Sequence, residues 1–180
     1  MLELTIQSLK DYLDLGRYGR GQAKSWDELE AEIRSGECHI EWQDDRPIRV
    51  VKVACVKVLS HKGERLIEVT QELADGRIRQ RGLIGISEKF KPQESPLEAA
   101  RRAMAEELDI HEELEFEVMG EAIEEKESVS YPGLLGRYYK FFFRVVFPPL
   151  LYKSEYIEVQ ATKRTIFKWI PCSCSESDPS

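Results

Sequence analysis

The sequence predicts an α/β fold in which one domain follows a helical extension. Residues 48–86 contain three stretches where apolar and polar residues alternate, and the turn sequences HKG and ADG separate them. Residues 96–108 instead repeat apolar residues at the spacing of an amphipathic helix. A chain of 180 residues is long enough to bury the core of such a domain.

The helical extension covers residues 1–45 and is expected to contain two helices. Residues 4–15 repeat apolar residues at helical spacing. Ser25 and Glu28 have the spacing of a capping box and Gly36 is a stop signal, so a second helix is expected between them. The preceding loop, GRYGRGQAK, is glycine-rich and basic, and a flexible connector is favoured over a phosphate contact there.

The domain covers residues 46–171 and is expected to be rich in strands. Strands are predicted over residues 48–60, 64–73, 77–86, 114–129 and 137–147, with one more strand or a hairpin over 156–171. The stretch 137–147 is apolar on both faces, which is typical of a central strand. The remaining residues, 172–180, have the composition of a solvated, disordered tail.

Charge and composition exclude several classes of protein. The chain has 26 basic and 33 acidic residues and a net charge of −7, so binding to nucleic acid through overall charge is not expected. Residues 1–20 lack the apolar region of a secretory signal, and the longest apolar stretch, 138–152, is too short to span a bilayer. The four cysteines lack zinc-binding spacing. We expect a soluble protein with reduced thiols, in the cytosol or an organelle interior, that is not secreted.

The helix over residues 96–108 has a clear start and a clear apolar face. Ser95 is a candidate N-cap, and Glu98 stands where the carboxylate of a capping box belongs. Arg102 lies four residues from Glu98 and from Glu106, so it can form an ion pair with either. An apolar stripe is expected to pack on the sheet, formed by Leu97, Ala100, Met104 and Leu108.

The stretch KFKPQESPLEAARRAMAEELDI, residues 89–110, resembles the box of the Nudix family. That box reads Gly, five residues, Glu, seven residues, Arg-Glu, an aliphatic, any residue, Glu-Glu, any residue, Gly, an aliphatic. The matching positions are Glu94, Arg102, Met104, Glu106, Glu107 and Ile110. The resemblance covers about residues 48–171 and implies a Nudix-like αβα sandwich around a mixed β-sheet.

The resemblance also implies a chemistry. The family holds divalent metal ions against a diphosphate, and carboxylates suit Mg²⁺ because it prefers oxygen ligands. An active chain would therefore use Mg²⁺ or Mn²⁺, with Glu106, Glu107 and Glu94 as metal ligands. The catalytic residues would be Glu106, Glu107 and Arg102. Candidate ligand-binding residues are Lys91 in the loop before the helix, and Tyr131 and Tyr138 around the later turn.

Five positions depart from the family pattern. Ala103 replaces the Glu of Arg-Glu, which removes one carboxylate from the helix side that carries positions 106 and 107. Ser87 and Glu88 replace two glycines of the loop, where a backbone carbonyl commonly completes the metal site. Asp109 replaces the late glycine, which is a mild change because Asp tolerates a left-handed conformation. Lys91 brings positive charge to a place that is commonly acidic.

Three functions are compatible with these departures. The favoured one is a degenerate Nudix-like domain that has lost efficient diphosphate hydrolysis and works as a ligand-binding or protein-interaction module, with no cofactor. The second is a divergent but active hydrolase that cleaves a nucleoside diphosphate linked to another moiety. The third is a structural subunit of a larger complex. A nucleotide-like small molecule is one expected ligand, and the extension over residues 1–45 is the expected contact with a protein partner.

Overall fold

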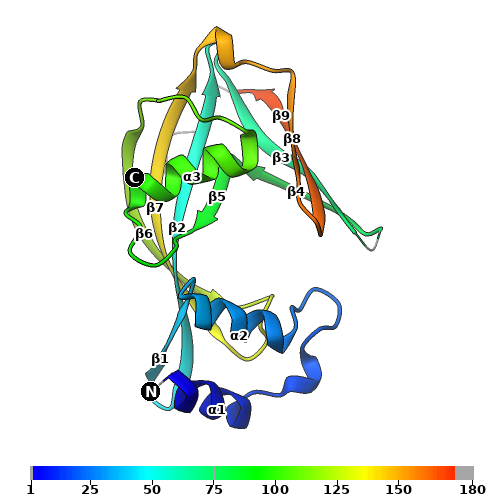
Figure 1. Cartoon of the computed structure of the whole chain (residues 1–180), viewed down its shortest axis with the longest axis vertical. Helices are drawn as coiled ribbons and strands as arrows, with labels where there is room; N and C mark the ends of the chain where they lie inside the picture. The colour runs from blue at the N-terminus through cyan, green and yellow to red at the C-terminus, as the bar shows by residue number, and fades with distance from the viewer. Residues whose placement is uncertain (1, 75, 173–180) are drawn as a thin grey trace. The chain divides into compact units, whose positions relative to one another are not determined.

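The computed structural model describes residues 2–74 and 76–172, and within them the α/β class is confirmed (Figure 1). The predicted tail falls outside these residues, apart from Cys172. The helices are α1 (Leu2–Tyr12), α2 (Trp26–Ser35) and α3 (Pro96–Leu108), and short 3₁₀ helices cover Leu15–Arg17 and Pro149–Leu151. None of the helices described is long and apolar enough to cross a membrane.

The strands form a nine-stranded sheet. They are β1 (His39–Gln43), β2 (Arg46–Ser60), β3 (Glu64–Leu73), β4 (Ile78–Ile84), β5 (Ile86–Lys89), β6 (Glu117–Glu127), β7 (Leu135–Phe147), β8 (Glu155–Val159) and β9 (Lys163–Pro171). The order is β6-β7-β2-β3-β9-β8, with β1 and β5 also paired to β2, and β4 to β3. Neighbours β2 and β7 run in the same direction in Figure 1, whereas β3 is antiparallel to β2, so the predicted mixed sheet is confirmed.

The structure refines two of the predicted strand segments and adds one strand. The segment predicted as one strand over residues 77–86 is divided at Gly85 into β4 and β5. The last predicted segment is a hairpin of β8 and β9, with Glu158 paired to Thr165. Strand β1 was not predicted, because its five residues carry too little alternation to distinguish them from a loop.

The described chain divides into two compact units, and each is built from several segments. Of the described residues, unit 1 takes 2–53, 89–99 and 121–141, and unit 2 takes 54–74, 76–88, 100–120 and 142–172. The helical extension is therefore part of a unit that also contains segments from the predicted domain. Whether residues 1–45 and 46–171 form separate domains stays a prediction.

The core of unit 1 joins the extension to later parts of the chain. Its buried side chains come from α1, α2, the segments that follow these helices, β2 and the turn before β7: Ile6, Leu9, Leu13, Tyr18, Leu29, Ile33, Cys38, Val51, Tyr131 and Leu134. The capping box of α2 is confirmed, since the Ser25 side chain accepts from the Glu28 N–H while the Glu28 carboxylate accepts from the Ser25 N–H. Burial raises the pKa of the Cys38 thiol, which keeps it protonated.

Unit 2 has its own core, which contains most of α3. Ala100, Ala103, Met104 and Leu108 are buried there together with residues of strands β2, β3, β7 and β9, including Val56, Leu66, Val145 and Phe167. Leu97, which was predicted to belong to the apolar stripe, is 37% exposed. It lies in the first turn of α3, whereas the packed part of the helix begins at Ala99 and Ala100, so the predicted stripe starts two residues too early.

Candidate functional site

Helix α3 begins and ends at the predicted residues. At the start, the Ser95 N–H donates to the Glu98 carboxylate over 2.8 Å, and the Glu98 N–H donates to the Ser95 hydroxyl over 3.3 Å. At the end, Asp109 takes a left-handed conformation with φ 56°, and the Ile110 N–H donates to the Met104 carbonyl over 3.2 Å. Asp109 therefore replaces glycine at a helix end without loss of the cap.

The loop before α3 is closed by one of the predicted metal ligands. The Glu94 carboxylate accepts a hydrogen bond of 2.8 Å from the Lys91 N–H, and the Glu94 N–H donates to the Lys91 carbonyl over 3.2 Å. Gln93 between them has φ 65°. The Glu94 side chain thus holds the turn together, and the exposed Lys91 side chain stands on that turn.

The glycine that this region requires is Gly85, which the comparison with the box did not single out. Gly85 has φ 69°, and a Cβ there would lie 2.0 Å from the Val56 carbonyl oxygen. Only glycine fits such a close approach of two strands. Ser87 and Glu88 lie beyond it in β5, and the Ser87 hydroxyl is 3.7 Å from the Cys55 sulfur. The strained backbone position therefore precedes the two predicted loop positions.

The paired glutamates of the box have different surroundings. Glu106 is exposed and accepts a hydrogen bond of 2.9 Å from the Arg102 guanidinium, which confirms one of the two ion pairs predicted for Arg102. The same guanidinium lies 3.7 Å from the Glu88 carboxylate. Arg102 therefore neutralises carboxylates on α3 and β5 at once.

Glu107 is largely withdrawn from water and has mostly acidic neighbours. Burial raises its pKa, and the carboxylates of Glu158 and Glu88 raise it further, to about 8. Glu68 adds to this repulsion, and the Lys163 ammonium opposes it. The Glu107 side chain therefore carries a proton at neutral pH.

The acidic neighbours of Glu107 belong to a polar face of the sheet in unit 2. Thr165 on β9 lies opposite Gln71 on β3 and opposite Glu158 on β8, so the three side chains share one face. All three are almost completely buried, as is Glu68. The Lys163 ammonium lies 3.4 Å from the Glu158 carboxylate. We call Glu68, Glu88, Glu107 and Glu158 the acidic cluster.

Position 103 is not open to such a site. Ala103 has no exposed surface, so it faces the interior of unit 2, while Glu106 three residues later is exposed beside Arg102. Whether positions 103, 106 and 107 could converge on one ion stays a prediction. Among the residues that the structure describes, no three His, Cys, Asp or Glu side chains are placed to hold a metal ion.

Tyr131 is enclosed by other side chains of unit 1, and its role in ligand binding stays a prediction. It is fully buried in unit 1, where Tyr18 stacks on it with ring centroids 6.2 Å apart and the Arg49 guanidinium lies 5.0 Å from the ring. Tyr138 is partly buried, and its ring packs against the backbone of Gly136 with the Lys126 ammonium 5.3 Å away. The helical extension contributes Tyr18, so this covering could not be expected from the turn sequence alone.

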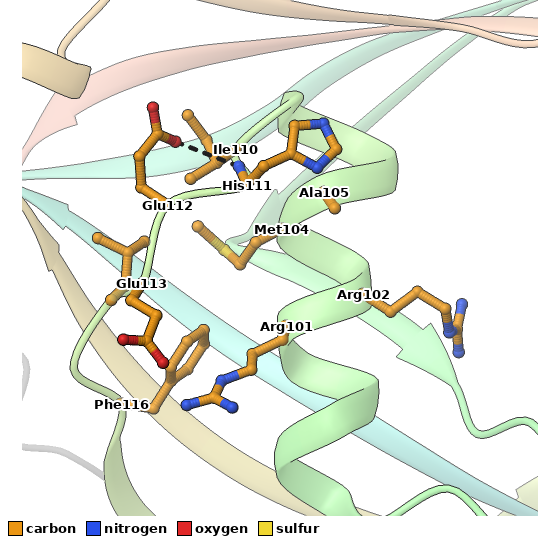
Figure 2. A pocket seen from close by; sticks show the side chains of 10 residues that line it. Arg101, Arg102, Met104, Ala105, Ile110, His111, Glu112, Glu113 and Phe116 are labelled. Atoms are coloured by element: carbon orange, nitrogen blue, oxygen red, sulfur yellow. Dashed lines mark hydrogen bonds between the residues drawn. The ribbon is translucent and has the colours of Figure 1, made fainter.

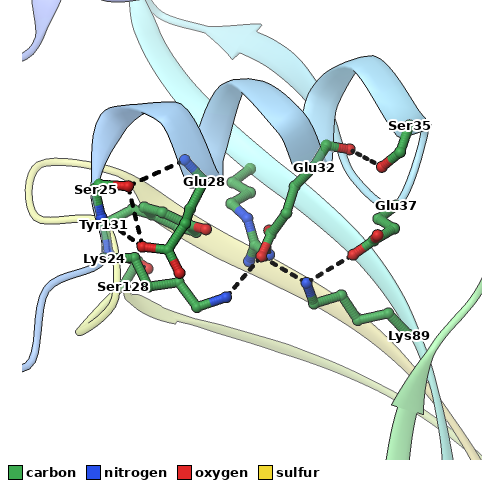
Figure 3. Close-up of polar contacts among 10 residues, drawn as sticks. Lys24, Ser25, Glu28, Glu32, Ser35, Glu37, Lys89, Ser128 and Tyr131 are labelled. Atoms are coloured by element: carbon green, nitrogen blue, oxygen red, sulfur yellow. Dashed lines mark hydrogen bonds and ion pairs between the residues drawn. The ribbon is translucent and has the colours of Figure 1, made fainter. Parts of the chain in front are cut away.

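A second buried carboxylate lies in unit 1, and Figure 3 shows the cations around it. Glu32 on α2 accepts from Arg49 over 2.5 Å, and the ammonium groups of Lys89 and Lys24 lie 2.6 Å and 3.0 Å from its oxygens. Burial alone would raise the pKa of Glu32, but these three cations lower it to about 2. Lys89 also reaches Glu37 over 3.0 Å.

A cavity of about 310 Å³ lies beside α3 in unit 2 (Figure 2). Its lining includes Met104 and Ile110, both buried, together with Phe116 and the charged side chains of Arg101 and Glu113. Figure 2 shows the Arg102 guanidinium pointing away from the other labelled side chains. None of the acidic cluster lines this cavity, so the two features are separate.

Sequence patterns did not identify one shared group in Glu68, Gln71, Glu158 and Thr165. The pairing of β3 with β4 and with β9 shifts between Glu68 and Thr70, which changes the residues that face inward. A strict alternation would have placed Gln71 on the face opposite Glu68. The nearest available signal was the unusual frequency of charged and amide residues in the stretch 64–73.

Comparisons with known proteins do not assign a family. No family model matches the chain, and no curated protein matches it. Among solved structures, the E. coli dihydroneopterin triphosphate pyrophosphohydrolase has a TM-score of 0.47 and 16% identity over 66% of this chain and 79% of that chain. The C. elegans Ap4A hydrolase has a TM-score of 0.40 and 16% identity, over 68% and 80% of the two chains. The MutT protein from Methanosarcina mazei Go1 has a TM-score of 0.41 and 17% identity, over 68% and 77%. These low identities and scores assign no role to any residue.

Proposed function

We propose that the chain is a degenerate Nudix-like domain that binds a ligand or protein partner and has lost efficient hydrolysis of diphosphates. The match of residues 89–110 to the Nudix box supports the family. The observation that carries the loss of hydrolysis is Ala103, which removes one carboxylate of the box and is completely buried. A larger acidic side chain has no open space at that position.

The charges that remain near the box are balanced within the protein, which supports the same proposal. Arg102 neutralises Glu106 and approaches Glu88, and Lys163 stands beside Glu158. Glu107 is neutralised by a proton instead. A metal-binding site needs ionised carboxylates, so Mg²⁺ would have to displace the proton from Glu107 and the cations beside Glu106 and Glu158 before it could bind here.

Thermal unfolding with and without Mg²⁺ or Mn²⁺ tests the loss of the metal site. A ligand that binds only the folded state stabilises it by mass action, so the wild type should show no rise in melting temperature at about 5 mM metal. A screen over nucleoside diphosphate derivatives should detect no metal-dependent hydrolysis. A large metal-dependent rise, with hydrolysis that Glu107→Gln abolishes and the exposed control Glu112→Gln retains, would contradict the proposal.

The second candidate is the divergent hydrolase, and the acidic cluster is the observation that favours it. Four carboxylates lie close enough to raise the pKa of one of them, and perturbed groups of this kind are common at functional sites. A cation could replace the proton on Glu107. The same metal titration decides between the candidates, because this reading requires that Mg²⁺ stabilise the wild type and that Glu107→Gln remove the effect.

A further inference from the structure

Two aromatic side chains of unit 1 remain open to water on the helical extension. Tyr12 ends α1 and is 46% exposed, and Trp42 on β1 is 41% exposed. Their ring centroids lie 5.7 Å apart with the planes at 87°, an edge-to-face contact. Large aromatic rings that stay exposed are the side chains that most often anchor a protein partner.

Both rings are carried by rigid elements. Helix α1 is fixed by Ile6 and Leu9, which are buried in the core of unit 1. Strand β1 pairs with β2, where Trp42 lies opposite Pro47. An anchor that is held in place before binding loses little conformational freedom when a partner arrives.

Acidic residues lie close to both aromatic residues along the chain. Asp44 and Asp45 form the two-residue turn between β1 and β2, directly after the pair of Gln43 with Arg46. In the described part of the chain, neither aspartate side chain has a hydrogen bond or an ion pair. Asp11 precedes Tyr12 and accepts a hydrogen bond of 2.9 Å from Gln7. We call Asp11, Tyr12, Trp42, Asp44 and Asp45 the acidic aromatic patch.

We propose that the acidic aromatic patch binds a basic segment of a protein partner through its arginine or lysine side chains. A guanidinium or ammonium is attracted to the face of an indole or phenol ring. The aliphatic part of the same side chain can cover the ring while its charged end reaches Asp44 or Asp45. The proposal rests on the proposed binding function and names the class of partner.

Charge favours a basic segment over nucleic acid or a second copy of the chain as the occupant of the acidic aromatic patch. Nucleic acid would bring phosphates to carboxylates, on a chain whose net charge is already −7. A second copy of the chain would bring the same carboxylates to the interface, and like charges across an interface are unfavourable. A basic segment is the occupant that the patch attracts.

Titration of the full chain with a capped tetra-arginine peptide tests the proposal. The NMR signal of the Trp42 indole N–H should shift with saturation. Those of Trp26 and Trp169 should move less, because their N–H groups already donate to Glu30 over 2.8 Å and to the Lys153 carbonyl over 2.7 Å. A tetra-citrulline peptide, which has the same shape without the charge, should cause no saturable shift. Binding should weaken several-fold in about 1 M salt, where the Debye length falls to about 3 Å.

A double variant separates charge from folding. Asp44 and Asp45 have φ 49° and 59°, and Asn-Gly is the pair preferred in a two-residue turn with both φ angles positive. Asp44→Asn with Asp45→Gly should therefore keep or raise the melting temperature, while the affinity for tetra-arginine falls about tenfold or more through loss of the charges. Asp27→Asn, which removes an exposed acid of α2, is the matched control and should bind as the wild type does.

Three results would overturn the proposal. The first is that the double variant binds tetra-arginine as tightly as the wild type does. The second is an equal response to tetra-citrulline. The third is a Trp42 signal that shifts with protein concentration alone, which would identify a second copy as the occupant. The titration does not involve α3, so it stands apart from the metal and hydrolysis tests, and either proposal can fail without the other.

Discussion

Glu32 in unit 1 and Glu107 in unit 2 are both helical glutamates with little contact with water, yet their pKa values move in opposite directions. Burial raises the pKa in both cases. Around Glu32, Arg49 and two lysines outweigh burial and lower the pKa to about 2. Around Glu107, other carboxylates add to burial and raise the pKa to about 8. The neighbouring charges, rather than the depth of burial, decide which form is stable.

The comparison distinguishes a site whose opposite charges hold the protein together from one in which a proton compensates for the repulsion among carboxylates. Nearby cations compensate the negative charge of Glu32. This network in unit 1 stabilises the attachment of α2 to β2 and β5. The acidic cluster in unit 2 has Lys163 beside Glu158 but keeps Glu107 neutral only through a proton. Perturbation of the two sites should therefore have unequal effects.

The largest effect is expected when the Glu32 carboxylate is removed from the network in unit 1. Glu32→Gln leaves the buried Arg49 without its carboxylate, and such a broken buried pair costs about 3–5 kcal/mol of unfolding free energy. Urea unfolding at neutral pH measures the loss. Glu30→Gln, which removes a partly exposed partner of Arg34 on the same helix, is the control and should have a much smaller effect. Equal losses in the two variants would show that the buried network contributes nothing special.

A smaller effect is expected when a carboxylate is added to the interior of unit 2. Ala103→Glu places a larger, ionisable side chain at a fully buried position and should lower the unfolding free energy by about 3 kcal/mol. Added Mg²⁺ should not restore it. Ala105→Glu, at a partly exposed position of α3, is the matched control with little expected change. A stable Ala103→Glu protein that Mg²⁺ stabilises further would show that the position does open to a metal site.

The smallest effect is a pH dependence whose sign differs between the two sites. The folded pKa of Glu107 exceeds its unfolded value, so its contribution is lost as pH rises from about 4.5 to about 8. Glu107→Gln should remove about 2 kcal/mol of the loss of unfolding free energy over this pH range. The amount is smaller than the full difference between the two pKa values implies, because Glu107 keeps some contact with water. Glu32 acts in the opposite way, since its contribution is lost as pH falls from about 4.5 to about 2. Unfolding free energies of wild type and Glu107→Gln, measured from pH 4 to 9, test this. The same dependence on pH in both proteins would contradict it.

The sequence was a good guide where structure is set locally. The start of α3 depends on Ser95 and Glu98, which are close in the chain, and both the bounds and the cap were predicted. The need for glycine at position 85 comes from the Val56 carbonyl on another strand, and no local pattern records it. The burial of Tyr131 also depends on a distant part of the chain, because the ring that covers it belongs to Tyr18 in the extension.

The candidate site was predictable only in part for a related reason. Spacing identified Arg102, Glu106 and Glu107, and it correctly paired Arg102 with Glu106. The partners of Glu107 come from β3, β5 and β8, and a shift in strand pairing decides that Glu68 faces inward. Local propensity carries no information on such register shifts.

The rate at which the Cys38 thiol reacts with a reagent can report the opening of unit 1. Cys38 is only 3% exposed and its pKa is raised, so a thiol reagent can react with it only while the surrounding core is open. The exposed Cys172 offers a reference reaction in the same molecule, and Cys55 is partly accessible. The ratio of the labelling rates of Cys38 and Cys172 would therefore report how often the helical extension detaches, under conditions where the protein as a whole remains folded.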